Sequence, residues 1–169
     1  HRVSRRQRQM CIRDSLSSMR ITQQEALNSF GSDEIYLEKF IENPRHIEVQ
    51  VIADNHGNAL HFFERDCSVQ RKNQKIIEEA PAWNLDKSKK EELFELCLNC
   101  LKKMKYKGVG TFEFLYKDSE FYFIEMNTRL QVEHTVTEMI TNIDLVKLQI
   151  ETAAGEKLSI KQKLSLIHI

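Results

Sequence analysis

Residues 111–127 contain the sequence feature that most limits what this chain can fold into. Two runs, TFEFLY and EFYFIEMN, are rich in aromatic residues and are separated only by Lys117, Asp118 and Ser119. Such runs predict β-strands, and a connection this short predicts that the strands pair antiparallel as a hairpin. We expect a three-residue loop at 118–120. The fold must therefore contain an antiparallel sheet.

The register of this hairpin decides whether two acidic side chains meet. In one of the two registers considered, Glu113 lies opposite Glu125, at a separation where like charges are destabilising. A divalent cation between them would relieve the repulsion, and Asn127 could add a third oxygen ligand for Mg²⁺ or Mn²⁺. The alternative is that both glutamates lie on a solvated face and bind nothing. The alternation predicts that Leu115 and Phe123 lie beside the glutamates on one face of the hairpin. The opposite face is predicted to be apolar and to consist of Phe112, Phe114, Tyr116, Tyr122, Ile124 and Met126.

A row of polar residues continues past the second strand. In extended backbone, every second residue points the same way. An acid, an amide, a cation, an amide and an acid then follow one another, which suits an oxyanion bound beside a metal nucleotide. Lys75, in the charge-dense segment 64–81, could add a second cation, although an ordinary exposed lysine is the alternative. The members of the row are Glu125, Asn127, Arg129, Gln131 and Glu133.

The rest of the chain alternates strands with helices. Helical spacing predicts helices over 20–30, from the N-cap Asp86 to near Gly108, and over 144–154, with a helical turn at 136–141. Extended runs are expected at 34–42 and 45–54, and a returning strand at 58–64; in the second run one face is apolar and one polar. The expected fold class is α+β, a mixed, mostly antiparallel sheet with packed helices.

Composition excludes several classes of protein. The chain of 169 residues has 25 Lys+Arg and 25 Asp+Glu, a balance that argues against nucleic acid as a partner. No apolar run approaches the roughly 18 residues of a membrane span. Cys97 and Cys100 are predicted to be core residues rather than a zinc or redox site, and free thiols fit a cytoplasmic location. The basic residues 1–15 and the segment 164–169 are expected to be tails, disordered or foreign to the fold.

Several long strings stand out in the sequence: YLEKFIENPRHIEVQVIAD, FFERDCSVQRKNQK, EEAPA, GTFEFL and FYFIEMNTRLQVEHTVTEMI. They strongly resemble the biotin carboxylase subunit of acetyl-CoA carboxylase, an ATP-grasp enzyme, with the biotin carboxylase domain of pyruvate carboxylase as a close relative. The resemblance covers roughly residues 17–162. It implies that residues 41–163 are the C-terminal ATP-grasp domain, and that residues 16–40 are a remnant of the lid domain with the interdomain strand.

The resemblance also implies a reaction, the ATP-dependent carboxylation of biotin on a biotin carboxyl carrier protein. Bicarbonate attacks the γ-phosphate of ATP to give carboxyphosphate and ADP, and the CO₂ unit then passes to the biotin ureido nitrogen. This is the first half-reaction of acetyl-CoA carboxylase in fatty acid synthesis. The implied cofactors are ATP and Mg²⁺ or Mn²⁺, and the implied partners are the carrier protein, carboxyltransferase subunits and a second copy in a homodimer.

Individual residues acquire roles from the same resemblance. It implies that Glu38, Lys39, Phe40, Ile41 and His46 contact the nucleotide. It implies that Glu113 and Glu125 join the metal to the ATP phosphates and that Asn127 is a further metal ligand. The implied bicarbonate pocket is Lys75, Arg129, Gln131 and the backbone at Val132, and the implied catalytic residues are Arg129, Glu133 as the base for bicarbonate, and Lys75.

Some positions depart from the family pattern. Asn73 stands where the family usually has a histidine, and Thr135 stands where acetyl-CoA carboxylases commonly have proline and pyruvate carboxylases frequently have threonine. The glycine-rich lid loop and the phosphate-clamping lysines have no counterpart in this sequence. We therefore expect a fragment with negligible carboxylation on its own. The alternatives are a non-catalytic piece that keeps only the fold, or a piece of a pyruvate carboxylase.

Overall fold

The structure, a computed structural model, describes residues 2–162, with side chains described from Ser15 onward. It consists of two units, His1–Phe40 and Ile41–Ile169. The first contains helix α1 (Arg2–Phe30), which includes the predicted helix at 20–30 and also the basic residues 2–15. The tail expected at 164–169 lies outside the described residues. No helix in the described part of the chain is long and apolar enough to cross a membrane.

The prediction of a strand at 34–42 is wrong, because this segment follows α1 without strand structure. A strand needs a neighbour to pair its backbone N–H and C=O groups. The five-strand sheet does not include this segment. The sequence alternation alone could not show that a pairing partner was missing.

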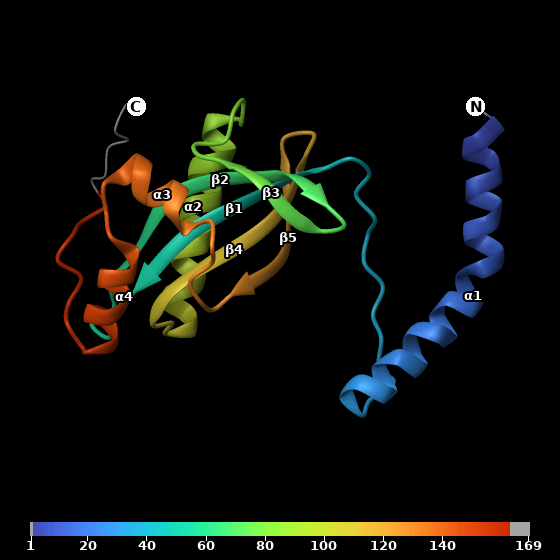
Figure 1. Cartoon of the computed structure of the whole chain (residues 1–169), viewed down its shortest axis with the longest axis horizontal. Helices are drawn as coiled ribbons and strands as arrows, with labels where there is room; N and C mark the ends of the chain where they lie inside the picture. Colours follow the sequence, from blue (N-terminus) through green and yellow to red (C-terminus); the bar gives the residue numbers. More distant parts are fainter. Residues whose placement is uncertain (1, 163–169) are drawn as a thin grey trace. The chain divides into compact units, whose positions relative to one another are not determined.

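The second unit is built on an antiparallel sheet with strand order β3-β2-β1-β4-β5 (Figure 1). Its strands are β1 (Arg45–Ala53), β2 (Ala59–Arg71), β3 (Gln74–Glu79), β4 (Gly108–Lys117) and β5 (Glu120–Asn127). Its helices are α2 (Lys87–Met104), α3 (His134–Thr141) and α4 (Leu145–Ala153). The predicted α+β class, with helices packed on a mostly antiparallel sheet, is confirmed.

Two apolar clusters attach the helices to opposite faces of the sheet. The α2 cluster joins Leu93 and Phe94 to Val49 and Val51 of β1. The α4 cluster joins Leu145 to Ile52, the next residue along β1. Because successive residues of a strand point to opposite faces, α2 and α4 cover opposite sides. Strand β1 is therefore buried on both of its faces.

Helix α2 forms as its sequence predicts. The Asp86 side chain accepts a hydrogen bond from the backbone N–H of Lys89, which satisfies one of the unpaired donors of the first turn. The helix ends at Lys105, a left-handed residue whose N–H returns to the carbonyls of the last turn. Lys102 and Lys103 lie in that turn, where cations interact favourably with the helix dipole.

The hairpin has the predicted pairing of Glu113 with Glu125, but its loop differs from the prediction. Its loop has two residues, Asp118 and Ser119, both with positive φ, and not the three that we expected. Continued without change, that register would place Ile124 opposite Glu113. A β-bulge shifts the register between Glu113 and Phe114, so that Glu113 faces Glu125. The predicted pairing of the two glutamates is confirmed, although the predicted loop is wrong.

The bulge also corrects the predicted faces of the hairpin. Phe123 lies on the α2 side, with its ring centroid 6.4 Å from that of Phe112 and 5.8 Å from that of Phe114. Ile124 lines the same hollow as Glu113. Phe123 was expected beside the glutamates and Ile124 on the apolar face. The extra residue of a bulge breaks the two-residue alternation on which those expectations rested.

Candidate active site

A hollow of about 860 Å³ lies on the face of the sheet that carries Glu113. All five strands and the segment between β5 and α3 contribute residues to it. It therefore brings together residues that are far apart in the sequence. Among its lining residues are nine for which the resemblance implied a role in binding or catalysis: His46, Lys75, Glu113, Glu125, Asn127, Arg129, Gln131, Val132 and Glu133.

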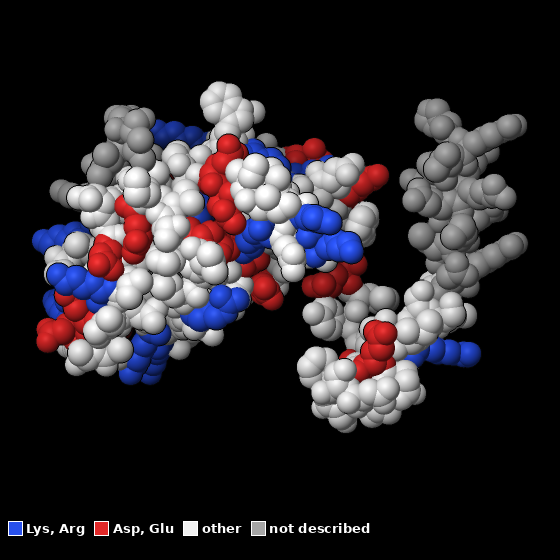
Figure 2. Space-filling model, in the orientation of Figure 1, with Lys and Arg blue, Asp and Glu red and all other residues white. Residues whose placement is uncertain are grey.

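Lys75 joins three carboxylates in this hollow. Its Nζ pairs with Glu48, lies 3.2 Å from Oε1 of Glu113, and lies 2.5 Å from Oε1 of Glu133. Burial acts to lower the pKa of Lys75, but the hydrogen bonds to Glu133 and Glu48 and the nearby negative charges raise it. The lysine therefore keeps its positive charge. Figure 2 likewise shows acidic and basic side chains next to one another on the visible face of this unit.

Glu113 accepts hydrogen bonds from several residues that line the hollow. Its Oε1 accepts hydrogen bonds from the side-chain amides of Asn127 and Gln131, each at 2.7 Å. The Asn127 amide also donates to Oε1 of Glu125 at 3.3 Å, so it links the two carboxylates that are predicted to bind the metal. Burial acts to raise the pKa of Glu113, but the hydrogen bond from His46 and the charge of Lys75 bring it below its usual value. Glu113 and Glu125 thus point to one site.

His46 is held between two carboxylates. Its Nε2 lies 2.8 Å from Glu113 and 3.2 Å from Glu48. Burial acts to lower its pKa, but the hydrogen bonds and charges of Glu113 and Glu48 raise the pKa to about 9. His46 is therefore a cation at neutral pH.

A buried layer below the hollow was missed in the sequence analysis. Arg65 is fully buried and donates to Glu48 at 3.0 Å, to Gln50 at 2.6 Å and to Gln131 at 3.3 Å. Burial acts to raise the pKa of Glu48, but its pairing with His46, Arg65 and Lys75 lowers the pKa to about 2. The available signal was the polar face of β1, where Glu48 and Gln50 alternate with apolar residues. Alternation predicted a polar face, but it could not predict that this face would be buried.

The row of polar residues leaves the sheet after Asn127, where β5 ends. The next residues are not in a strand, yet Arg129, Gln131 and Glu133 still line the hollow. Glu133 is buried, whereas Arg129 is exposed. The side chain of Val132 is also exposed. The row therefore surrounds one hollow although its backbone is not extended throughout.

The predicted nucleotide contacts are divided between the two units. Glu38, Lys39 and Phe40 belong to the first unit, and Ile41 begins the second. His46 lies in the hollow, as described. Their roles in binding nucleotide stay predictions.

The residues of the hollow fit a divalent metal ion. Carboxylate and amide oxygens of Glu113, Glu125 and Asn127 are hard ligands that suit Mg²⁺ or Mn²⁺. Glu113 also belongs to a group with His46 and Glu48 whose possible ligand atoms all lie within 4.8 Å of one another. The predicted ligand set and this group share Glu113.

Comparisons with known proteins show which family the chain resembles. Residues 10–161 match the family described as the carbamoyl-phosphate synthase L chain, ATP binding domain. The biotin carboxylase of Pseudomonas aeruginosa is 53% identical over 148 residues, covering 88% of this chain and 33% of that protein. Pyruvate carboxylases are among the other relatives. The chain thus spans about a third of the length of the biotin carboxylases it matches.

Solved structures of biotin carboxylases are also similar to this one, and two of them illustrate the match. The biotin carboxylase–β,γ-ATP complex from Campylobacter jejuni matches with a TM-score of 0.85 and 48% identity, covering 91% of this chain and 35% of that chain. The biotin carboxylase domain of 2-oxoglutarate carboxylase from Hydrogenobacter thermophilus, in complex with MgADP, ADP and bicarbonate, matches with a TM-score of 0.81 and 48% identity. That match covers 88% of this chain and 33% of that chain.

Proposed function

We propose that this chain, which belongs to the carbamoyl-phosphate synthase L chain ATP-binding family and is a relative of biotin carboxylases, supplies the metal- and bicarbonate-binding part of an ATP-dependent biotin carboxylase. One observation carries the proposal. In a single hollow, Lys75 contacts Glu113 and Glu133, and Asn127 links Glu113 to Glu125. This arrangement combines a cation for an oxyanion, a carboxylate base and oxygen ligands for a metal.

Each of these groups has a role in the proposed reaction. Lys75 offsets the negative charge of bicarbonate, and Glu133, which lies beside Lys75, takes the bicarbonate proton as general base. The exposed guanidinium of Arg129 binds bicarbonate and stabilises the enolate-like form of biotin. A metal ion held by Glu113, Glu125 and Asn127 neutralises charge on the ATP phosphates when it is bound.

The substrates and partners of the whole enzyme follow from the same proposal. They are ATP with Mg²⁺ or Mn²⁺, bicarbonate, and biotin on a carrier protein, with carboxyltransferase subunits downstream, a second copy in a homodimer and a cytoplasmic location. The proposed acceptor is acetyl-CoA, in fatty acid synthesis. A pyruvate carboxylase parent is the second candidate, supported by Thr135 and by the pyruvate carboxylase relatives.

Bicarbonate binding tests the proposal without requiring turnover. In the presence of Mg²⁺ and ADP, ¹³C-bicarbonate should show NMR line broadening with the chain, and the broadening should be lost with Lys75→Met. The matched control is Lys103→Met, which removes a lysine from the last turn of α2, outside the hollow. If Lys75→Met, shown to be folded by circular dichroism, broadens the signal as the unaltered chain does, the proposed bicarbonate pocket is wrong. If the unaltered chain causes no broadening, the chain keeps only the fold.

A further inference from the structure

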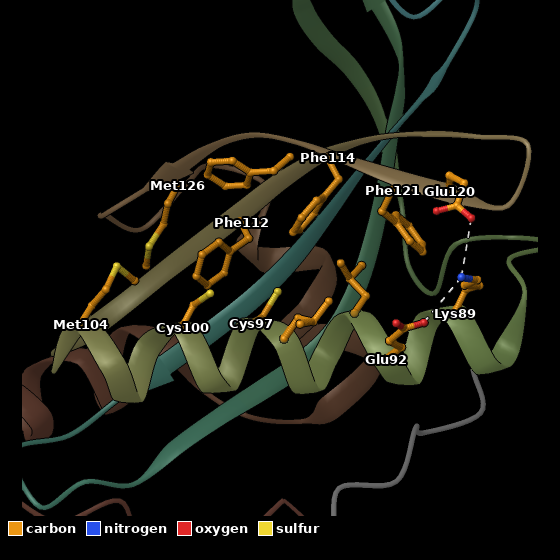
Figure 3. Close-up of a pocket in the computed structure, with 13 residues that line it drawn as sticks. Lys89, Glu92, Cys97, Cys100, Met104, Phe112, Phe114, Glu120, Phe121 and Met126 are labelled. Carbon is orange, nitrogen blue, oxygen red and sulfur yellow. Dashed lines mark ion pairs between the residues drawn. The ribbon is translucent and has the colours of Figure 1, made fainter. Parts of the chain in front are cut away.

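A second cavity lies on the other face of the hairpin, between α2 and the strands β4 and β5 (Figure 3). Its volume is about 490 Å³, within the range of roughly 300–1,000 Å³ that small-molecule sites occupy. Phe112 and Phe114 line it, while Glu113, between them in β4, lines the candidate active site. The sheet therefore separates this cavity from the proposed metal and bicarbonate site.

Its lining is apolar except at one end. Four phenylalanine rings and Met126 form the sheet side, and Leu93, Leu96 and Met104 form part of the helix side. The charged groups are Lys89, Glu92 and Glu120, with Lys89 Nζ 3.7 Å from Glu92 and 3.6 Å from Glu120. Two carboxylates against one ammonium leave this end with a net negative charge. The cavity therefore favours an apolar ligand that carries no negative charge.

Two thiols line the helix side of the cavity. Cys97 and Cys100 lie one helical turn apart on α2, and Figure 3 shows both side chains directed from the helix toward Phe112. Cys97 is buried, and burial raises its pKa to about 12, which leaves it a protonated thiol. Cys100 is exposed. Since the thiolate is the nucleophile, Cys100 is the thiol that can react with a molecule in the cavity.

We propose that this cavity binds uncharged aromatic molecules and directs those with an activated carbon–carbon double bond onto Cys100. The Cys100 thiolate adds to the β-carbon, forming one S–C bond and breaking the π bond. The resulting enolate takes a proton from water. The addition is redox-neutral and needs no leaving group or cofactor. An aromatic ring held by the phenylalanines raises the effective concentration of the double bond at the sulfur.

The test compares two maleimides that differ in the group on nitrogen. In a Cys11→Ser background, the rate of modification is measured with N-phenylmaleimide and with N-(2-carboxyethyl)maleimide. Each rate is divided by the rate of the same reagent with N-acetylcysteine. Peptide mass spectrometry identifies the modified cysteine. We expect the normalised rate to be about tenfold higher for the phenyl reagent, with the adduct on Cys100 and none in Cys100→Ser.

A change at the rim of the cavity shows whether the cavity causes the preference. Leu96 lines the cavity but is 56% exposed, so Leu96→Glu should fold and should reduce the preference for the phenyl reagent to near unity. Ile150→Glu is the matched control on α4, where Ile150 is 65% exposed, and should leave the preference unchanged. Equal normalised rates for the two reagents, adducts mainly on Cys67 or Cys97, or a preference that survives Leu96→Glu would each overturn the proposal.

Discussion

The two faces of the sheet differ most clearly in how they treat a histidine. His46 faces the candidate active site, where two carboxylates raise its pKa to about 9. His61 of β2 faces α2, where its ring stacks on that of Phe94 with the ring centroids 4.0 Å apart. Burial lowers the pKa of His61 to about 4. Both are largely withdrawn from water, so burial alone does not set the charge. The partners on each face do, and the same strands thereby present a charged face and an apolar face.

The largest expected effect on stability comes from removing Arg65, the buried cation below the charged face. Arg65→Met should remove one of the three cationic partners of the buried Glu48 and reduce the free energy of unfolding by about 3–5 kcal/mol. Ile47→Val removes one methyl group from the apolar face of the same region and should cost about 0.5–1.5 kcal/mol. Urea unfolding measures both. The account is wrong if Arg65→Met costs no more than Ile47→Val.

A paired replacement sharpens the same test. In Glu48→Met with Arg65→Met, neither charge remains unpaired in the interior, and apolar side chains of similar volume take their place. Most of the stability lost in Arg65→Met should return. A double variant as unstable as Arg65→Met would show that the network does not act through charge pairing.

The two histidines should give opposite pH dependences of stability. The folded-state pKa of His46 lies above its unfolded value of about 6.5, so its contribution is complete below pH 6.5 and is lost as pH rises toward 9. The contribution reaches at most about 3 kcal/mol. The folded-state pKa of His61 lies below 6.5, so its contribution is present above that pH and is lost as pH falls toward 4.

NMR titration of the two imidazoles and unfolding at several pH values check this prediction. His46→Gln should remove the loss of stability between pH 6.5 and 9, and His61→Gln should remove the loss between pH 6.5 and 4. Titration of both histidines near pH 6.5 would contradict the contrast between the faces.

The sequence predicted the features that local interactions determine, but not those that depend on packing between segments. Local signals were sufficient for α2, whose N-cap Asp86 and apolar stripe are confirmed. The pairing of Glu113 with Glu125 was also predicted, but from a three-residue loop, whereas the chain combines a two-residue loop with a bulge. A two-residue loop without the bulge would place Ile124 opposite Glu113, and a three-residue loop with the bulge would place Met126 there. Turn and bulge geometry depend on the packing of the whole hairpin, which alternation does not encode.

The buried layer depended on contacts between distant segments. Nothing around Arg65 in the sequence indicates that it contacts Gln50, Thr137 and Gln131. Those residues come from a neighbouring strand, from α3 and from the segment before α3. The sequence therefore predicted the residues that line the hollow better than the residues that support them.

The smallest expected effect comes from the bulge itself. Deleting Ile124, whose side chain is 40% exposed, should remove the extra residue of the bulge and leave Glu113 opposite Glu125. We expect a loss of about 1 kcal/mol in stability and little change in Mn²⁺ affinity. Ile124→Ala, which keeps the bulge, is the control. A loss of Mn²⁺ binding on deletion would show that the bulge, and not the pairing, positions the carboxylates.

Mn²⁺ binding followed by electron paramagnetic resonance tests the central claim most directly, that Glu113 and Glu125 hold one ion together. Glu113→Gln and Glu125→Gln should each weaken Mn²⁺ binding about tenfold or more, and the double variant should lose less than the sum of the two effects, because both residues bind the same ion. Glu95→Gln, on α2, should change nothing. Unchanged affinity in either active-site variant, or strictly additive losses, would contradict the shared site.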